Sequence, residues 1–227
     1  MFQAILFDFD GTLVDFVDAD LQSLRWLHVH SGAAVSCEAF LETAVDAIMA
    51  FHQLVAEQAV DPLLMHRWRL QNTFARYDLS WDDAYVDLYR AQLIEACVPF
   101  VGVEPLLAQV RHKAKTGLIS NAYDVQEQRA RIAHAGLDRY FDSIVIACEV
   151  GSYKPEPDIF WHALAQLGVA PEDALYIGDS VTHDIAGAKA AGMRAALLSR
   201  TPRPAPLADY IVSSIAELHQ LLDKVLV

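Results

Sequence analysis

Cysteine is scarce in this sequence, and the few cysteines lie far apart. The 227 residues include 3 cysteines, Cys37, Cys97 and Cys148, with no C-x-x-C pair among them. A disulfide framework or a structural zinc site needs cysteines that are paired or clustered at short spacing. We therefore expect reduced thiols and neither of these two stabilising devices.

Long apolar runs are also missing. The longest uninterrupted run, residues 96–103, is far below the roughly 20 residues that a membrane-spanning helix needs. The first residues, Met-Phe-Gln-Ala-Ile-Leu-Phe-Asp, contain neither a basic segment nor a small-residue cleavage site. We expect no signal peptide and no membrane partner, and hence a soluble protein in the cytoplasm.

Positive charge is in deficit. The chain has 17 Lys and Arg against 30 Asp and Glu, a formal net charge of −13, and no basic run. Because nucleic-acid binding draws much of its affinity from neutralising phosphates, we expect no nucleic acid polymer as a partner. A small phosphorylated metabolite is still possible, since one metal ion and one lysine can reverse the field inside a pocket. With 54% hydrophobic and 21% charged residues, the composition is that of a globular protein.

Short apolar runs alternate with amphipathic helices along most of the chain. We predict strands at residues 3–8, 116–120, 143–148, 174–178 and 194–198, with a weaker one at 210–212. Helix start signals lie between and after them, such as the capping boxes of Asp124 with Glu127 and Ser214 with Glu217. Repeated strand and helix units of this length predict an α/β fold, a doubly wound parallel sheet covered by helices on both faces.

A helical block interrupts this alternation after the first strand. Four helical patterns lie at about 18–31, 37–59, 62–77 and 81–96. We predict an inserted α-helical domain over 16–96, with residues 1–15 and 97–227 forming the core. Ligands bind beyond the carboxyl ends of parallel strands, so we expect the insertion to act as a lid. Three arginines in the third pattern fit either a substrate contact or an exposed helix face: Arg67, Arg69 and Arg76.

Two aspartates end the first predicted strand. Asp8 and Asp10 are followed by Gly11. Close carboxylates repel each other unless a cation lies between them or one is protonated, which suits a Mg²⁺ site with one nucleophile and one acid. A solvated Asp-Gly turn explains these residues equally well when they are taken alone.

Polar groups also follow three other predicted strands. Taken alone, each of these groups has a simpler explanation. Ser120 and Asn121 are typical of a turn or a helix cap, and Asp179 with Asp184 is typical of a helix cap. Lys154 alone is typical of a solvated surface charge. Their joint position favours chemistry, because a parallel sheet delivers all of these groups to one edge. A carboxylate nucleophile, a hydroxyl, a lysine and a metal-binding carboxylate are what is needed to hold and attack a phosphoryl group.

These four segments resemble, in order, the four motifs of the haloacid dehalogenase superfamily. They read Asp8-Phe-Asp-Gly-Thr-Leu, Ser120-Asn, Lys154-Pro and Gly178-Asp-Ser-Val-Thr-His-Asp184. The resemblance covers the first strand and the chain from about residue 100 onward, in a Rossmann-like core, and the helical block resembles the superfamily's inserted cap. Residues 151–192 are most similar to the phosphoglycolate phosphatase and pyrimidine 5′-nucleotidase-like branches.

The resemblance implies a Mg²⁺-dependent phosphatase that hydrolyses a small phosphate monoester through an aspartyl phosphate. Asp8 would attack phosphorus, and Asp10 would protonate the leaving alcohol and then activate water. The resemblance further implies substrate binding by Thr12, Ser120, Asn121 and Lys154, with Thr12 also positioning Asp10 and Lys154 neutralising charge during catalysis. It implies a Mg²⁺ site made by Asp8, the Asp10 carbonyl oxygen and Asp179, with Asp184 in support.

Three alternatives stay open. A 2-haloacid dehalogenase would use the same nucleophile on carbon, but the resemblance implies that such an enzyme lacks an acid at the position of Asp10 and needs no Mg²⁺. A sugar-phosphate phosphomutase would need the lid to exclude water, which the sequence does not test. A non-catalytic binding protein on the same scaffold is disfavoured because no motif residue is replaced. The sequence identifies neither the physiological substrate nor the oligomeric state.

Overall fold

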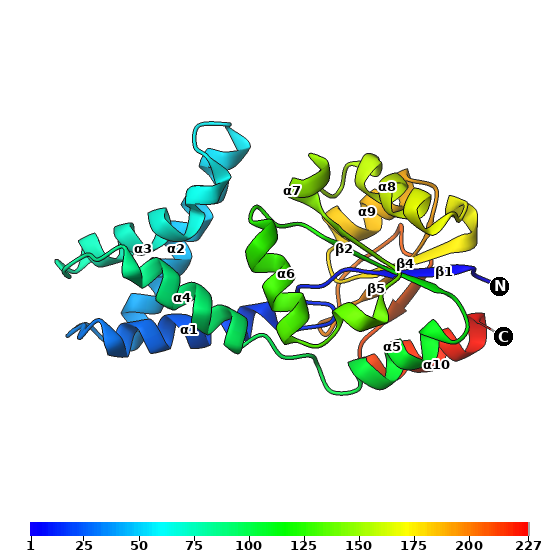
Figure 1. Ribbon diagram of the computed structural model, residues 1–227, viewed down its shortest axis with the longest axis horizontal. Coiled ribbons are helices and arrows are strands. Elements are labelled where there is room, and N and C mark those ends of the chain that lie inside the picture. Colours follow the sequence, from blue (N-terminus) through cyan, green and yellow to red (C-terminus); the bar gives the residue numbers. More distant parts are fainter. Residues whose placement is uncertain (227) are drawn as a thin grey trace. The chain divides into compact units, whose positions relative to one another are not determined.

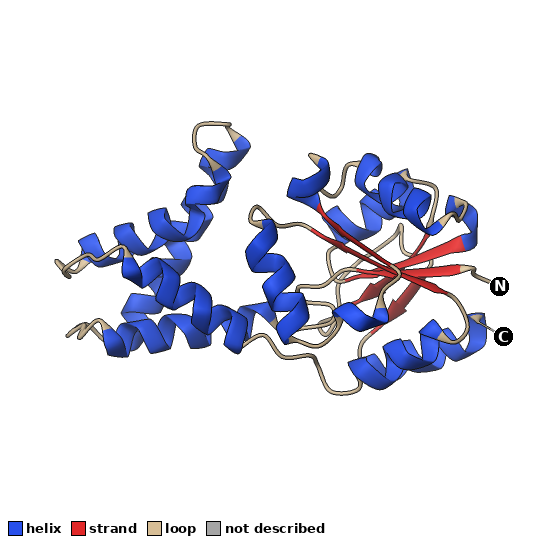
Figure 2. Ribbon diagram, in the orientation of Figure 1, coloured by secondary structure: helices blue, strands red, loops and turns tan. Residues whose placement is uncertain are grey.

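The computed structural model describes residues 1–226 and contains a six-stranded parallel sheet (Figure 2). The strands are β1 (Ala4–Phe7), β2 (Lys115–Ser120), β3 (Ser143–Ile146), β4 (Ala174–Gly178), β5 (Arg194–Leu198) and β6 (Tyr210–Val212). Their order across the sheet is β3-β2-β1-β4-β5-β6. This order is that of a doubly wound sheet and confirms the predicted fold class. The third strand is shorter than predicted because helix α7 (Ala147–Val150) begins directly after it.

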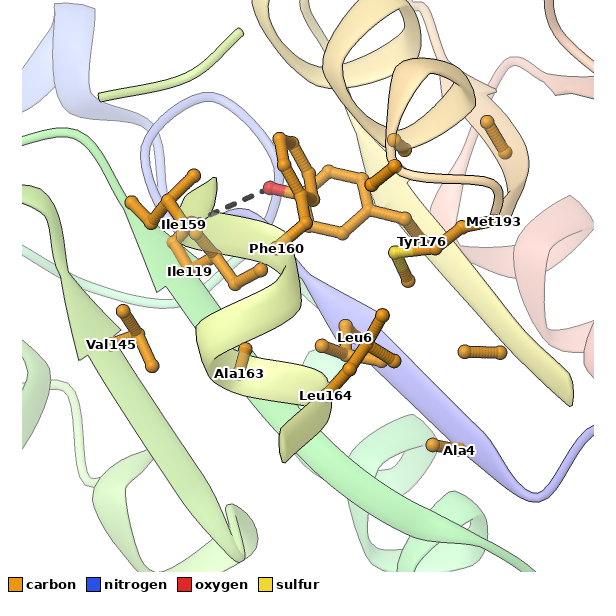
Figure 3. Close-up of a cluster of buried hydrophobic side chains, with 14 of the residues drawn as sticks. Ala4, Leu6, Ile119, Val145, Ile159, Phe160, Ala163, Leu164, Tyr176 and Met193 are labelled. Carbon is orange, nitrogen blue, oxygen red and sulfur yellow. Dashed lines mark hydrogen bonds between the residues drawn. The ribbon is translucent and has the colours of Figure 1, made fainter. Parts of the chain in front are cut away.

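Helices cover both faces of the sheet (Figure 1). Helices α5 (Val103–Arg111) and α10 (Ile215–Val225) lie together on one side, and α8 (Pro157–Leu167) and α9 (Ala186–Ala190) lie on the other. Helix α6 (Val125–His134) follows β2, and shorter helical turns are η2 (Asp138–Tyr140), η3 (Pro171–Asp173) and the π-helical η4 (Val181–Ile185). Phe160 of α8 packs with buried side chains of the sheet, such as Leu6, Ile119 and Tyr176, in a core cluster (Figure 3).

The cap residue of each predicted capping box accepts hydrogen bonds as expected, whereas the Glu217 carboxylate accepts from the N–H of Ser213, one residue before the cap, at 2.8 Å. The Asp124 carboxylate accepts hydrogen bonds from the backbone N–H groups of Gln126 and Glu127, at 2.9 and 3.1 Å, at the start of α6. The Ser214 hydroxyl accepts one from the Glu217 N–H, at 3.2 Å, at the start of α10. These side chains satisfy amide groups that a helix leaves unpaired in its first turn, which is why the capping pattern locates the helix starts.

The position of β1 in the sheet determines where its carboxyl end lies. Phe7 pairs with Leu118 of β2 on one side and with Ile177 of β4 on the other. The N–H of Asp8 then donates to the Ile177 carbonyl oxygen at 2.8 Å. All four residues of β1 are buried, as expected of an apolar strand inside a parallel sheet. The ends of β1, β2 and β4 therefore meet at one edge.

The chain divides into two compact units, one made of Met1–Phe16 with the chain from Val98 onward and the other of Val17–Cys97. The second unit is built from helices: α1 (Phe16–His30), α2 (Cys37–Ala56), η1 (Pro62–Leu64), α3 (Met65–Arg76) and α4 (Ala84–Glu95). The structure divides the chain after Phe16 and after Cys97. The sequence predicted these two boundaries one residue earlier, after residues 15 and 96. The action of this unit as a lid stays a prediction.

One of its helices is long and apolar enough to cross a membrane by length and composition. An 18-residue window of α2 has a mean hydropathy of 1.3, and 22% of it is buried. Soluble proteins contain such helices too, and Glu42 and Asp46 interrupt the apolar residues of this one. The finding is therefore weak support for a membrane partner.

Arg69 lies inside the helical unit rather than on an exposed face. Its side chain is 1% exposed and binds both carboxylate oxygens of Asp20, at 2.7 and 2.9 Å. Its Nε donates to the Ala44 carbonyl oxygen at 2.9 Å, and the Tyr89 hydroxyl donates to Asp20. Arg69 thus joins α1, α2, α3 and α4, and neither of the two roles considered from the sequence describes it.

We expect Asp20→Ala to destabilise the helical unit strongly, because it leaves the buried Arg69 guanidinium without its counter-charge. Breaking a buried pair in this way typically costs about 3–5 kcal/mol. The matched control is Asp83→Ala, which removes the partner of Arg67 in an ion pair whose carboxylate is 63% exposed. Urea unfolding of both variants measures the difference, and equal losses of stability would contradict a structural role for the Arg69 pair.

Candidate active site

Three carboxylates converge at the ends of β1 and β4. Asp8 follows β1, Asp179 follows β4, and Asp184 lies in the π-helical turn η4. One carboxylate oxygen from each lies within 4.8 Å of the others. Asp8 and Asp184 are 5% and 1% exposed, whereas Asp179 is partly exposed. Asp184 also accepts a hydrogen bond from the Ser180 N–H at 2.9 Å, which restrains its side chain.

Lys154 supplies the positive charge at this cluster. Its Nζ lies 2.6 Å from Asp8 Oδ1 and 2.7 Å from Asp184 Oδ1. The same ammonium is 3.1 Å from the Tyr176 hydroxyl and 3.2 Å from the Ile119 carbonyl oxygen. Since every neighbour is a hydrogen-bond acceptor, Lys154 is held in one place beside Asp8.

Burial and charge act against each other in this cluster. Burial alone would lower the pKa of Lys154, but Asp184 and Asp8 raise it, so the ammonium stays protonated. Burial raises the pKa of Asp8 to about 8, although Lys154 opposes the shift. Burial and Asp184 also raise the pKa of Asp179. One ammonium therefore does not neutralise three carboxylates, and the cluster favours a further positive charge.

Two glycines allow the chain to pass close to these acids. A Cβ on Gly178 would lie 2.3 Å from Asp184 Cγ. Gly11 has a φ of +83°, and a Cβ there would lie 2.7 Å from Asp179 Oδ2. Neither contact is possible for real atoms, so both motifs need glycine for steric reasons.

Ser120 is the last residue of β2 and Asn121 follows it, and their side chains have different hydrogen-bond partners. Ser120 is 1% exposed, and its Oγ accepts a hydrogen bond from Gln128 Nε2 at 2.9 Å. The Asn121 side chain binds the backbone of Lys154, accepting from its N–H at 2.9 Å and donating to its carbonyl oxygen at 3.0 Å. Asn121 therefore ties the Lys154 segment to β2, a structural role that the sequence did not reveal.

The Asp10 side chain is bound to helix α6. Asp10 Oδ2 accepts from Arg131 Nη1 and from Gln128 Nε2, both at 3.2 Å, and Oδ1 accepts from Arg131 Nη2. Thr12 is fully buried, and within residues 1–226 its hydroxyl has no hydrogen-bond partner. The implied hold of Thr12 on Asp10 is thus not seen in the described chain, and the substrate-binding role of Thr12 stays a prediction.

Some side chains that were not selected from the sequence bind the predicted residues or the loop that carries Asp10 and Thr12, among them those of Gln128, Arg131, Tyr176 and Arg200. The first two lie three positions apart, so they share a helix face, and this spacing was the available signal. Tyr176 lies within the apolar strand β4, so nothing in the sequence indicated that its hydroxyl group contacts the site. Arg200, in the loop after β5, donates to the Gly11 carbonyl oxygen at 2.6 Å.

Fold and site together define an α/β protein with an acidic site at the carboxyl edge of a doubly wound sheet. A family model for haloacid dehalogenase-like hydrolases matches residues 2–192. The chain belongs to the haloacid dehalogenase-like hydrolase family, and the membership predicted from the four motifs is confirmed.

Known relatives of the chain include phosphatases. N-acylneuraminate-9-phosphatase of Mus musculus is 27% identical over 241 residues, which cover 98% of this chain and 94% of that protein. Pyrimidine 5′-nucleotidase YjjG of Escherichia coli (strain K12) is 38% identical over 136 residues, which cover 58% of this chain and 60% of that protein.

Solved structures show the same fold. YfnB of Bacillus subtilis, described as bound to magnesium, has a TM-score of 0.83 at 22% identity and covers 98% of this chain and 99% of its own. L-2-haloacid dehalogenase of Xanthobacter autotrophicus has a TM-score of 0.75 at 20% identity, covering 98% of this chain and 99% of its own. Because the fold is shared so widely, the reaction has to be argued from the site.

Proposed function

We propose that this protein is a Mg²⁺-dependent phosphoric monoester hydrolase that acts on a small phosphorylated metabolite. The state of Asp8 is the observation that carries the proposal. One carboxylate oxygen binds Lys154, while the other, Oδ2, is buried and has no hydrogen-bond partner among residues 1–226. Such an oxygen is available to attack an electrophile or to bind a cation. The phosphatases among the relatives support phosphorus as that electrophile.

The acidic cluster fits a divalent cation. With all three carboxylates ionised and Lys154 protonated, the charge is 1 − 3 = −2. The available donors are oxygens, which Mg²⁺ prefers. Asp8, the Asp10 carbonyl oxygen and Asp179 would hold the ion, and Asp184 would support the site while paired with Lys154. When bound, Mg²⁺ supplies positive charge that stabilises the phosphoryl oxygens.

The reaction then divides into two steps carried by the chain's own residues. Asp8 attacks phosphorus, the bond from phosphorus to the alcohol oxygen breaks, and Asp10 gives its proton to the departing alcohol. Water next attacks the phosphorus of the aspartyl phosphate, Asp10 takes the water proton, and inorganic phosphate leaves Asp8. Throughout, Lys154 neutralises charge at Asp8, while Ser120 and the Asn121 N–H donate to phosphoryl oxygens.

Phosphate release from p-nitrophenyl phosphate tests the proposal. We expect turnover with Mg²⁺, loss of turnover with excess EDTA, and recovery when Mg²⁺ is restored. Halide release from 2-chloropropionate by a protein that releases no phosphate would overturn it. A panel of phosphorylated metabolites, ranked by kcat/KM, would then identify the preferred substrate.

We expect Asp179→Ala to raise the Mg²⁺ concentration needed for half-maximal activity by about tenfold or more, because it removes one oxygen ligand. Excess Mg²⁺ should restore part of the rate, since Asp8 and Asp10 are unchanged. Asp173→Ala, which changes an aspartate just before the opposite end of β4, serves as the matched control. An unaltered Mg²⁺ dependence in Asp179→Ala would remove Asp179 from the metal site.

A further inference from the structure

Helix α6 presents two buried polar side chains, Gln128 and Arg131, to the loop that follows β1. Each is 2% exposed. Arg131 binds both oxygens of the Asp10 carboxylate through Nη1 and Nη2, and its Nη1 also donates to Gln128 Oε1 at 2.8 Å. Burying a guanidinium is costly, so its place beside Asp10 calls for a compensating interaction, which the carboxylate provides.

Aromatic rings restrict the guanidinium further. The Arg131 Cζ atom lies 4.7 Å from the centre of the Phe16 ring and 5.5 Å from that of Phe9. A planar guanidinium bonded at its nitrogens and placed against rings has little freedom to rotate. Arg131 therefore offers Asp10 a fixed pair of donors.

Gln128 links this pair to the phosphoryl-binding side of the site. Its Nε2 donates to Asp10 Oδ2 at 3.2 Å and to Ser120 Oγ at 2.9 Å. Its Oε1 accepts from Arg131, so both ends of the amide are used. One helix thus sets the relative positions of Ser120, at the end of β2, and Asp10, in the loop that follows β1.

The hydrogen bonds also distinguish the two oxygens of Asp10. Among residues 1–226, Oδ2 accepts two of them, from Arg131 and Gln128, whereas Oδ1 accepts one, from Arg131. A carboxylate oxygen has about two acceptor positions, so Oδ1 keeps one position for a transferred proton. The Asp10 side chain is 25% exposed and hence accessible.

We propose that Arg131 and Gln128 are positioning residues that orient Asp10 so that its Oδ1 transfers the proton. This inference rests on the proposed function, because it assumes that Asp10 acts on a leaving alcohol. Proton transfer needs the two heavy atoms at hydrogen-bond distance, and a small rotation of the short Asp10 side chain would break that alignment. Arg131 acts through Asp10 and does not itself touch the substrate.

The decisive measurement is the single-turnover rate of phosphoenzyme formation from an alkyl phosphate relative to that from p-nitrophenyl phosphate, because the water attack that follows is common to both esters. An alkoxide needs a proton to leave, whereas p-nitrophenolate does not, so misorientation of Asp10 affects mainly the alkyl ester. For Arg131→Met we expect this rate to fall by about 10- to 100-fold for the alkyl ester, with a much smaller fall for the aryl ester. KM for both esters should change by less than about threefold, since substrate binding is retained.

Arg129→Met is the matched control on the same helix. Arg129 also binds a carboxylate with two nitrogens, but its partner is Glu149 and its side chain is 49% exposed. We expect this variant to keep the wild-type ratio of alkyl to aryl rates. Gln128→Met should shift the ratio in the same direction as Arg131→Met, because it removes a donor to Asp10 Oδ2.

Two further variants separate positioning from stability. Arg131→Lys keeps a positive charge but cannot bind both oxygens in the same geometry, so we expect it to restore stability more than the rate ratio. In an Asp10→Asn background, Arg131→Met should leave the ratio unchanged, because the oriented group is already gone.

Equal losses on both esters in Arg131→Met would overturn the inference, as would an unchanged ratio. If Arg131→Met does not fold, a wild-type ratio in Arg131→Lys would overturn it in the same assay. A wild-type protein that releases phosphate from neither ester, nor from any of the panel of phosphorylated metabolites, would instead overturn the proposed function. The two failures are therefore distinguishable.

Discussion

Asp8→Asn removes turnover and leaves the fold intact: we expect kcat to fall by at least ~10³-fold. The amide has nearly the shape of the carboxylate but no anionic oxygen with which to attack phosphorus. Its carbonyl oxygen still accepts a hydrogen bond from Lys154, which lies 2.6 Å from Asp8 Oδ1. Lys154 also keeps its ion pair with Asp184, at 2.7 Å, so the buried ammonium is not left without a counter-charge.

The stability of the metal-free protein provides an independent check on this variant. Burial raises the pKa of Asp8 to about 8 from an ordinary value of 3.8. The folded protein therefore favours the protonated acid, and this stabilisation is present at low pH and is lost as the pH rises through 8. In EDTA, Asp8→Asn should thus gain thermal stability relative to the wild type as the pH is raised from about 4 to 8.

Two measurements test the covalent step directly. Acid quenching of the wild type during turnover should trap a phosphorylated protein, detectable by intact mass, and Asp8→Asn should show none. Asp158→Asn, a change of a carboxylate in the first turn of α8, should keep both turnover and the trapped species. A well-folded Asp8→Asn protein with a rate near that of the wild type would end the aspartyl phosphate mechanism.

The sheet and the grouping of the motif residues were predictable because they depend on local patterns. An apolar run such as residues 4–7 predicts a buried strand, and the polar residue that follows it marks the strand's carboxyl end. In a parallel sheet those ends share one edge, so Asp8, Lys154 and Asp179 were expected together. The structure places Lys154 and Asp179 near Asp8, at the distances given above.

Contacts made by polar side chains within helices were not predictable in the same way. Arg69 and Arg131 lie in helices whose patterns look the same whether an arginine is exposed or buried. What decides between the two cases is a partner far away in the sequence: Asp20 is 49 residues from Arg69, and Asp10 is 121 residues from Arg131. Tertiary packing brings these pairs together, and no local spacing encodes them.

Asp10→Asn should slow esters with poor leaving groups far more than it slows aryl phosphates. If Asp10 gives a proton to the departing alkoxide, its loss costs the alkyl ester about 10²- to 10⁴-fold, the usual value of general acid catalysis. A p-nitrophenolate leaves with little help, so the first step on the aryl ester is largely spared. Asp10→Asn also removes the general base that activates water in the second step, and this step is the same for both esters. Single-turnover kinetics are therefore used to compare the rate of the first step, phosphoenzyme formation, between the two esters.

The ratio of alkyl to aryl rates in Asp10→Asn also decides between phosphorus and carbon chemistry. A dehalogenase shows no such gap, because a halide ion departs without a proton. The fold must be checked first, since this substitution leaves the buried Arg131 beside a neutral amide, and removing one charge of a buried pair is destabilising. Unfolding of Asp10→Asn in urea measures that cost. In protein shown to be folded, an equal fractional loss on both esters would mean that Asp10 serves the metal site or the fold, and the acid and base roles would have to be assigned to another group.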